Sequence, residues 1–486
     1  MKKVWTILLS VLMLASLLTA CGKSGSEYQP PHKTNTFDET NIVLQFGAVS
    51  DIHVGRSGSG IRTDSWATDA FQTLRDLAAQ YSADGLSAML VSGDLTDNGN
   101  DQQIRDFAGL YENVFDPAKV PLIFSLGNHD VNVGSSYCLE GQDFEGFYEQ
   151  LGSKYRQYES DSRLDIGCVH QIVNGYHFLA VNPMDEGYRN TLANSVMYSA
   201  EARKWLDETM ARITAENPEQ YVFVSTHPIM YGMAYGGEHT YTTTGWFTRE
   251  IPDILKAYPQ AVAFGGHVHF PIHSDLSIMQ TTFTSLQCGS VNYMSNEDGE
   301  YRDSNAPVSL VDRETVHSGY LVQVDGNNNV RILRMSFSYK RESKYPFVLQ
   351  SPQADGSHLL DYGWDRGSTD QNEAPVLPAD AISVADDGAE KAVGEQVTPR
   401  LTFKAGTDDD QVHAYAVSVR DERGYLMETQ RVLADFYKVI RVDQMKDAWS
   451  FTLTGKYYKG ESYEIMLVAA DDWGVASEPV TYLYQP

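Results

Sequence analysis

The sequence lacks the features expected of a nucleic-acid-binding protein or a zinc-stabilised scaffold. Only 37 basic residues stand against 65 acidic ones, which gives a formal net charge of −28. Non-specific nucleic-acid binding needs basic surface to neutralise phosphates, so this balance argues against a nucleic-acid polymer as partner. The chain has four cysteines and no pair with CxxC spacing, which argues against a structural zinc site.

A long hydrophobic run is also missing. The apolar run 4–18 is shorter than the roughly 20 residues of a membrane span. It follows two lysines and precedes small residues, the layout of a secretory signal, and it ends in LTAC (18–21), which resembles a bacterial lipobox. We therefore predict a signal peptide at 1–21, a lipidated Cys21, a flexible tether at 22–41 and an extracytoplasmic protein anchored to the bacterial membrane. An ordinary signal peptide with an incidental cysteine is the alternative.

Three cysteines remain after Cys21, namely Cys138, Cys168 and Cys288. Because the number is odd, at least one is expected to be free. An oxidising compartment allows a bridge between Cys138 and Cys168, and the sequence does not decide whether it forms.

Five apolar runs suited to buried strands each end in a polar cluster. The runs are 42–49, 86–91, 122–126, 221–224 and 261–264, and the clusters are SDIH (50–53), SGDLTD (92–97), GNHD (127–130), STHP (225–228) and GGHVH (265–269). Segments with helical period at 69–81, 101–115 and 199–213 alternate with them, which indicates βαβ units. Ligands of such sheets bind at the carboxyl ends of the strands, so these polar side chains are expected to lie together.

The residue types in the clusters favour a divalent metal site. Aspartate and histidine suit Mn, Fe or Zn. Asp-x-His and His-x-His pairs direct both side chains to the same side of an extended segment. The neighbouring glycines permit tight turns and close backbone approach, and Asn128 offers a neutral carbonyl oxygen.

The motifs DIH, GDLTD, GNHD, THP and GGHVH, in this order, resemble the calcineurin-like metallophosphoesterase family over about residues 42–340. Each motif alone is common turn chemistry, whereas the ordered set of five is specific. The resemblance implies an α/β fold, a four-layer α/β/β/α sandwich over 42–345.

The resemblance also implies a site with two divalent ions and an enzyme that hydrolyses phosphate esters. The first ion would be held by Asp51, His53, Asp94 and His269, and the second by Asp94, Asn128, His227 and His267. A hydroxide bridging both ions would attack phosphorus in line. His129 would assist the leaving group, and Asp130 would orient its imidazole.

Two positions of the motifs indicate which branch of the family the chain resembles. Purple acid phosphatases carry a glycine and a metal-binding tyrosine where this chain has His53 and Asp97. The ligand set therefore resembles the cyclic-nucleotide and glycerophosphodiester phosphodiesterase branch, which favours phosphodiesterase over phosphatase activity. Asp97 is not assigned as a ligand, because capping of the following segment explains it equally well.

Three residues are candidates for substrate binding. Arg56 follows the first motif and is placed to contact a phosphate oxygen. Tyr231 and His239 belong to the long segment 229–246 after His227, which we expect to overhang the site. Surface packing is the alternative for these two residues.

The remainder of the chain predicts a second domain. GYLVQVDGNNNVRILRMSF (319–337) predicts a hairpin that closes the first domain, and 346–378 is typical of a linker. Short alternating strands with turn signals over 379–486 resemble an Ig or fibronectin type III-like β-sandwich, with Tyr463 placed like a tyrosine corner.

We therefore expect an enzyme that hydrolyses a phosphodiester or phosphomonoester. A nucleotide or pyrophosphate hydrolase is the alternative within the enzyme class. A binding lipoprotein with an inactive metal site is the alternative from another class, and the complete ligand set argues against it.

Overall fold

The computed structural model describes residues 35–486, apart from 57–62, 132–143, 184–197, 238–246, 297–298, 301–316, 354, 356, 358, 369, 387–389 and 437–444. Cys21 and His239 therefore lie outside the described residues. Among the residues that are described, no helix has the length and apolar character needed to cross a membrane.

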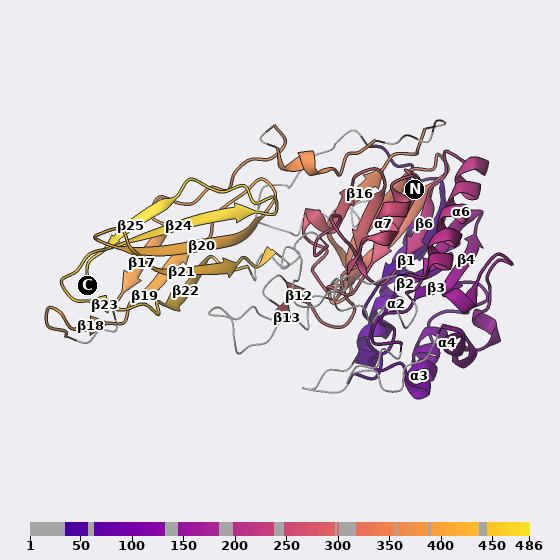
Figure 1. Cartoon of the computed structure of the whole chain (residues 1–486), viewed down its shortest axis with the longest axis horizontal. Helices are drawn as coiled ribbons and strands as arrows, with labels where there is room; N and C mark the ends of the chain where they lie inside the picture. Colours follow the sequence, from indigo (N-terminus) through magenta and orange to yellow (C-terminus); the bar gives the residue numbers. More distant parts are fainter. Residues whose placement is uncertain are drawn as a thin grey trace, which may run out of the picture. The chain divides into compact units, whose positions relative to one another are not determined.

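Two six-stranded sheets form the first part of the chain (Figure 1). The first sheet has the order β16-β15-β14-β1-β2-β3, with β1 (Ile42–Val49), β2 (Ala88–Ser92), β3 (Leu122–Ser125), β14 (Ser318–Asp325), β15 (Val330–Ser336) and β16 (Arg341–Leu349). Strand β2 runs parallel to both β1 and β3. The predicted hairpin is confirmed, because β14 and β15 pair in antiparallel register.

The second sheet has the order β10-β11-β9-β6-β5-β4. Its strands are β4 (Cys168–Val173), β5 (Tyr176–Val181), β6 (Val222–Ser225), β9 (Ala261–Gly265), β10 (Ile278–Gln280) and β11 (Thr284–Gln287). Strand β6 is parallel to β5 and to β9. All five predicted strands are therefore present, with boundaries that differ from the expected ones by at most two residues.

The two sheets pack face to face through aromatic side chains. Phe46 of β1 lies with its ring centroid 5.0 Å from that of Phe178 on β5 and 4.7 Å from that of Phe223 on β6. All three rings are fully buried. This aromatic layer fixes the distance between the sheets and therefore the distance between the loops that follow their strands.

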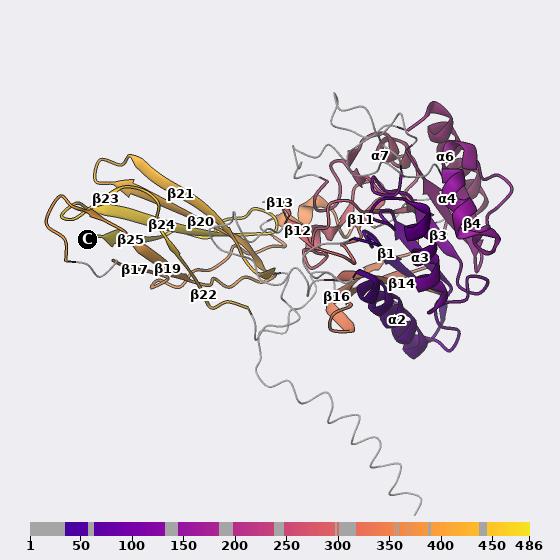
Figure 2. The same cartoon turned by 90° about the horizontal axis from the view of Figure 1, so that it is seen from below.

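Helices cover the outer faces of both sheets, as can be followed in Figures 1 and 2. α2 (Thr63–Tyr81), α3 (Asp101–Glu112) and α4 (Phe144–Leu151) pack on the first sheet, and α6 (Ala200–Glu216) and α7 (Glu250–Leu255) pack on the second. Helix α3 begins at the side chain of Asn100, which accepts a hydrogen bond from the backbone N–H of Gln103. The four-layer α/β/β/α sandwich is confirmed.

The C-terminal region is all-β, as predicted. A three-stranded sheet contains β17 (Ile382–Ala385), β19 (Arg400–Lys404) and β22 (Ala448–Thr452), and a four-stranded sheet contains β20 (Val412–Asp421), β21 (Leu426–Leu433), β24 (Tyr463–Asp471) and β25 (Val480–Tyr484). Phe403, Tyr415 and Trp449 form the centre of its core, with ring centroids 4.7–5.5 Å apart. We call residues 382–484 the C-terminal β unit.

The hydroxyl of Tyr463 accepts a hydrogen bond from the backbone N–H of Tyr458 at 2.8 Å. A tyrosine corner makes the same kind of contact, from a tyrosine hydroxyl to the backbone a few residues upstream. The assignment to the Ig or fibronectin type III class stays a prediction, as do the domain boundaries.

Small elements complete the fold. They are the two-residue strands β7 (Ile229–Met230), β8 (Phe247–Thr248), β12 (Ser295–Asn296), β13 (Gly299–Glu300), β18 (Gln396–Val397) and β23 (Tyr457–Tyr458) and the turns η1 (Ser153–Tyr155), η2 (Leu164–Ile166), η3 (Asp275–Ser277) and η5 (Trp364–Gly367). Cys168 and Cys288 are buried free thiols, and Cys138 lies outside the described residues.

Candidate metal centre

The polar residues after β1, β2, β3, β6 and β9 meet at one place. The structure brings together all seven residues that were predicted as metal ligands: Asp51, His53, Asp94, Asn128, His227, His267 and His269. They come from both sheets, because each set of parallel strands directs its carboxyl ends towards the same edge. Apart from Asn128 and His267, which are partly exposed, these residues are buried.

The backbone around these residues is unusual. Five residues of the site have left-handed φ values, namely Asp51 (57°), His53 (51°), Asp94 (50°), His267 (72°) and His269 (54°). Each such residue costs of order 1–3 kcal/mol and persists only where its surroundings hold it, often at functional sites. A Cβ atom on Gly127 would collide with the Asp94 carboxylate, so this approach of two loops requires glycine.

The first group of potential ligands consists of Asp51, His53, Asp94 and His269, whose donor atoms all lie within 4.8 Å of one another. Nε2 of His269 is 3.0 Å from Oδ1 of Asp51 and 3.4 Å from Nε2 of His53. Nε2 of His53 is 3.6 Å from Oδ2 of Asp94. The donor atoms therefore converge on one point.

The second group contains Asp94, His227 and His267. Oδ1 of Asn128 joins it, 3.2 Å from Nε2 of His227 and 3.0 Å from Nδ1 of His267. Nε2 of His227 is 3.4 Å from Oδ2 of Asp94, the oxygen that also faces His53. Asp94 is thus shared by both groups.

The buried atoms of the site fit divalent cations. Oδ1 of Asp51 is buried and has no hydrogen-bond partner within the described part of the chain. Burial lowers the pKa of His53 to about 4, and burial together with the neighbouring His227 lowers the pKa of His267 to about 3, so both imidazoles offer lone pairs at neutral pH. Burial alone would lower the pKa of His227, but the Asp94 carboxylate raises it to about 9. The negative charge of Asp94 thus favours a positive charge at this place, as a metal cation would supply.

Backbone carbonyls orient two of the histidines. Nδ1 of His227 donates to the carbonyl oxygen of Ser92 at 2.7 Å, and Nδ1 of His269 donates to that of Tyr293 at 2.8 Å. These bonds fix the rings with Nε2 directed at the carboxylates.

Asp97 has a role that the sequence did not reveal. Its Oδ1 lies 3.4 Å from Nδ1 of His53, and its carbonyl oxygen accepts a hydrogen bond of 2.8 Å from Nδ1 of His129. Burial alone would raise the pKa of Asp97, but its interaction with His53 lowers it, so the group is ionised. The only sequence signal was its place in GDLTD, where capping was an equally good explanation.

The role of Asp130 in orienting the His129 imidazole stays a prediction, while its hydrogen bonds show a further role. The Asp130 carboxylate accepts four hydrogen bonds, from the backbone N–H groups of Leu95, Thr96 and Gly127 and from the Thr96 hydroxyl. Its carboxylate therefore links the loop after β2 to the loop after β3. Successive side chains after a strand point in different directions, so Asp130 and His129 need not face the same group.

His129 lies beside the first group. Its ring centroid is 4.6 Å from that of His53, and its backbone N–H donates to Oδ1 of Asp94 at 2.9 Å. Burial alone would lower the pKa of His129, but the negative charge of Asp94 and the bond to Asp97 raise it. A larger share of this imidazole is thus protonated near neutral pH.

The predicted substrate residues have different positions. The Arg56 guanidinium lies 4.1 Å from the ring centroid of Tyr293, and this ring lies 4.0 Å from that of His269. Arg56 is therefore next to the site. Tyr231 follows β7 and stacks with Arg249 at 3.4 Å and with Phe247 at 5.1 Å.

Comparison with known proteins shows what this part of the chain is similar to. Residues 44–271, slightly less than half of the chain, match the family model described as calcineurin-like phosphoesterase. No curated protein matches the chain.

Two solved structures illustrate more distant similarity. A purple acid phosphatase from yellow lupin seeds is 14% identical, with a TM-score of 0.41, over 65% of this chain and 55% of the lupin chain, which is less than two thirds of the lupin enzyme. A 5'-nucleotidase precursor from Thermus thermophilus is 11% identical, with a TM-score of 0.29, over 85% of this chain and 94% of the other.

Proposed function

We propose that the protein hydrolyses a phosphate ester, preferentially a diester, with two divalent ions held by the groups that share Asp94. The observation that supports this most strongly is the position of Oδ2 of Asp94, 3.6 Å from Nε2 of His53 and 3.4 Å from Nε2 of His227. One carboxylate oxygen between two sets of ligands is what a bridged two-metal site needs. When bound, two such ions lower the pKa of a bound water towards neutrality and offset the charge of the phosphate.

The residues of the chain supply the rest of the chemistry. His129, with its raised pKa, donates a proton to the leaving oxygen. Asp97 holds this imidazole through its backbone carbonyl. Arg56, which is held over Tyr293, binds a phosphate oxygen.

The metal would be Mn, Fe or Zn, since aspartate and histidine ligands accept all three. Complete sets of donor atoms in both groups favour an active enzyme over a binding protein with an inactive site. Anchoring through Cys21 stays a prediction from the LTAC motif.

Hydrolysis assays test the proposal. The purified protein, with Mn²⁺ or with chelator, would be given bis(p-nitrophenyl) phosphate and p-nitrophenyl phosphate. We expect faster turnover of the diester, with loss of turnover in chelator. Preference for the monoester would make the protein a phosphatase or nucleotidase, and turnover that is insensitive to chelator would contradict the metal mechanism.

A further inference from the structure

The loop that carries His267 and His269, which we call the ligand loop (266–275), does not end at the metal centre. It continues to Ser274 and Asp275, where it contacts the C-terminal β unit. The Ser274 hydroxyl donates to Oδ2 of Asp472 at 2.6 Å, and the backbone N–H of Asp275 donates to the same oxygen at 3.1 Å.

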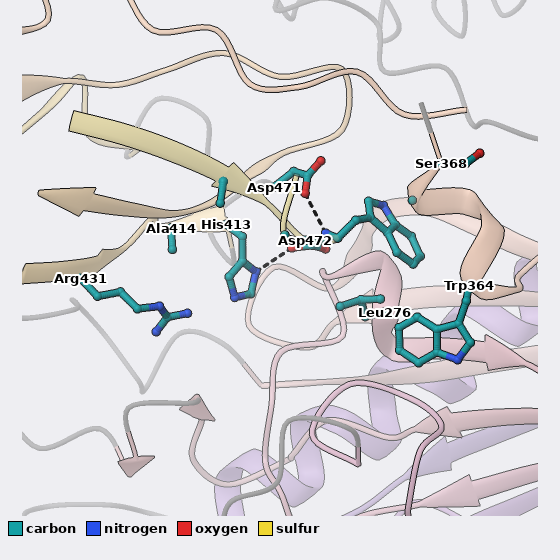
Figure 3. A pocket seen from close by; sticks show the side chains of 12 residues that line it. Leu276, Trp364, Ser368, His413, Ala414, Arg431, Asp471 and Asp472 are labelled. Atoms are coloured by element: carbon teal, nitrogen blue, oxygen red, sulfur yellow. Dashed lines mark hydrogen bonds and ion pairs between the residues drawn. The ribbon is translucent and has the colours of Figure 1, made fainter. Parts of the chain in front are cut away.

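Asp472 is itself held firmly within the C-terminal β unit. Nδ1 of His413 donates to Oδ1 of Asp472 at 2.7 Å, and the side chain of Gln411 donates to Oδ2 at 2.8 Å. Figure 3 shows His413 and Asp472 joined in this way. Burial alone would raise the pKa of Asp472, but the bond to His413 lowers it, so a buried carboxylate receives all four donors.

A second, ionic contact lies beside the first. The Asp275 carboxylate is 2.8 Å from Nη1 of Arg334 and 3.0 Å from Nζ of Lys344. Nζ of Lys344 also lies 2.5 Å from Oδ1 of Asp410 in the C-terminal β unit. All four side chains are buried, so removing one partner would leave an uncompensated charge.

Apolar contacts follow the same route. Phe270, next to His269, has its ring centroid 4.7 Å from that of Tyr235, whose ring lies 5.8 Å from that of His413. Trp473 packs against the apolar cluster that contains Phe270 and Leu276. The C-terminal β unit therefore also has apolar contacts next to the loop that carries the ligand histidines.

A cavity of about 800 Å³ borders this contact, lined among others by Leu276, Trp364, His413, Arg431 and Asp472 (Figure 3).

The ligand loop needs such an anchor. His267 and His269 have φ values of 72° and 54°, which ordinary residues adopt only where neighbouring structure holds them. Strand β9 fixes the loop before these residues, and Asp472 fixes it after them.

We propose that Asp472 is a positioning residue, through which the C-terminal β unit holds His267 and His269 in their metal-binding conformation. This inference rests on the proposed function of the same site. It makes the C-terminal β unit a part of the metal centre's scaffold rather than a separate module.

Mn²⁺ binding to the metal-free full chain, measured by calorimetry, tests the inference. We expect Asp472→Asn, which keeps the shape but loses the charge, to weaken Mn²⁺ binding by about 10-fold. Asp421→Asn is the control, because Asp421, the last residue of β20, also accepts backbone hydrogen bonds, from Arg423 and Tyr425, but contacts no part of the ligand loop among the described residues. It should change Mn²⁺ binding by less than about twofold.

A double-mutant cycle adds a readout that general destabilisation would not reproduce. Ser274→Ala removes the partner of Asp472 on the ligand loop, so the two substitutions should be non-additive in Mn²⁺ affinity. The Co²⁺ absorption spectrum should change in each variant, since it reports ligand geometry. If Asp472→Asn fails to fold, Gln411→Ala takes the place of that variant in the cycle, because it removes one of the four hydrogen bonds to Asp472.

The outcomes separate the two proposals. If the wild-type chain binds no Mn²⁺, the proposed function fails. If it binds Mn²⁺ and the folded Asp472 or Gln411 variant binds equally well, or if Asp421→Asn has the same effect, the positioning role is wrong.

Discussion

The backbone N–H of His129 donates a hydrogen bond of 2.9 Å to Oδ1 of Asp94. This bond occupies one carboxylate oxygen and leaves Oδ2 directed at His53 and His227. The residue that we assign to the leaving group is therefore joined directly to the residue that we assign to both metals. Substitutions can separate the two roles, because the bond uses the backbone of His129 and not its imidazole.

His129→Ala should reduce hydrolysis without weakening Mn²⁺ binding. A general acid contributes about 10²–10⁴-fold, and most for a poor leaving group. We expect a large loss for a diester with an alkyl leaving group and a small one for bis(p-nitrophenyl) phosphate. Equal losses for both substrates would contradict the role as acid.

Asp97→Asn should weaken Mn²⁺ binding by about 10-fold, because the charge beside Nδ1 of His53 is lost. The bond to His129 is made by the backbone carbonyl and survives. Turnover at saturating Mn²⁺ should therefore recover to within roughly threefold of wild type, since most of the effect is on metal binding. Turnover that stays low at saturating Mn²⁺ would show that the Asp97 carboxylate acts in the chemical step instead.

Gly127→Ala should reduce turnover by about 100-fold, because the added Cβ displaces the Asp94 carboxylate. Gly109→Ala is the matched control. Gly109 lies in the exposed part of α3 with open space around it, so alanine should stabilise the protein by about 0.5–1 kcal/mol without changing turnover. Thermal unfolding and assays of both variants check this, and normal turnover in Gly127→Ala would refute the steric argument.

We predict that the stability of the folded chain depends on pH through Asp408 in the C-terminal β unit. Burial, together with the charges of Asp409 and Asp471, raises the pKa of Asp408 to about 7. A raised folded-state pKa means that the folded chain binds this proton more tightly. The stability from this proton is thus complete below the unfolded pKa of about 4 and is lost as the pH rises through about 7.

Asp408→Asn should therefore raise the melting temperature by roughly 1–3 °C at about pH 8 and by less at about pH 5. The amide oxygen can still accept the hydrogen bond from the backbone N–H of Asp410. Glu422→Gln, at an exposed carboxylate that is not among the charges acting on Asp408, is the control and should show no such pH dependence. A gain that is larger at acid pH would contradict the assignment.

Much of the site could be predicted because it follows from chain geometry. Parallel strands such as β1 and β2 direct their carboxyl ends to one edge, so Asp51 and Asp94 had to be neighbours. The alternation in Asp51-x-His53 and His267-x-His269 placed each pair correctly, even though the structure reaches this arrangement with left-handed backbone at all four residues.

The rest depends on contacts that leave little trace in the sequence. A carbonyl oxygen, such as that of Asp97 bonded to His129, exists at every position of the chain and marks none. The direction of the Asp130 side chain depended on donors in another loop. The contact between Ser274 and Asp472 joins residues far apart in the chain, and neither residue belongs to a motif.

The central claim is that Asp94 bridges two metal ions, and counting bound Mn²⁺ tests it most directly. Calorimetry and elemental analysis of the purified wild-type chain should give two Mn²⁺ per chain, with hydrolysis that follows metal occupancy. Asp94→Asn should retain fewer than two ions and lose turnover by at least about 100-fold. Two tightly bound ions in Asp94→Asn, or hydrolysis by a wild-type chain that carries none, would contradict the account.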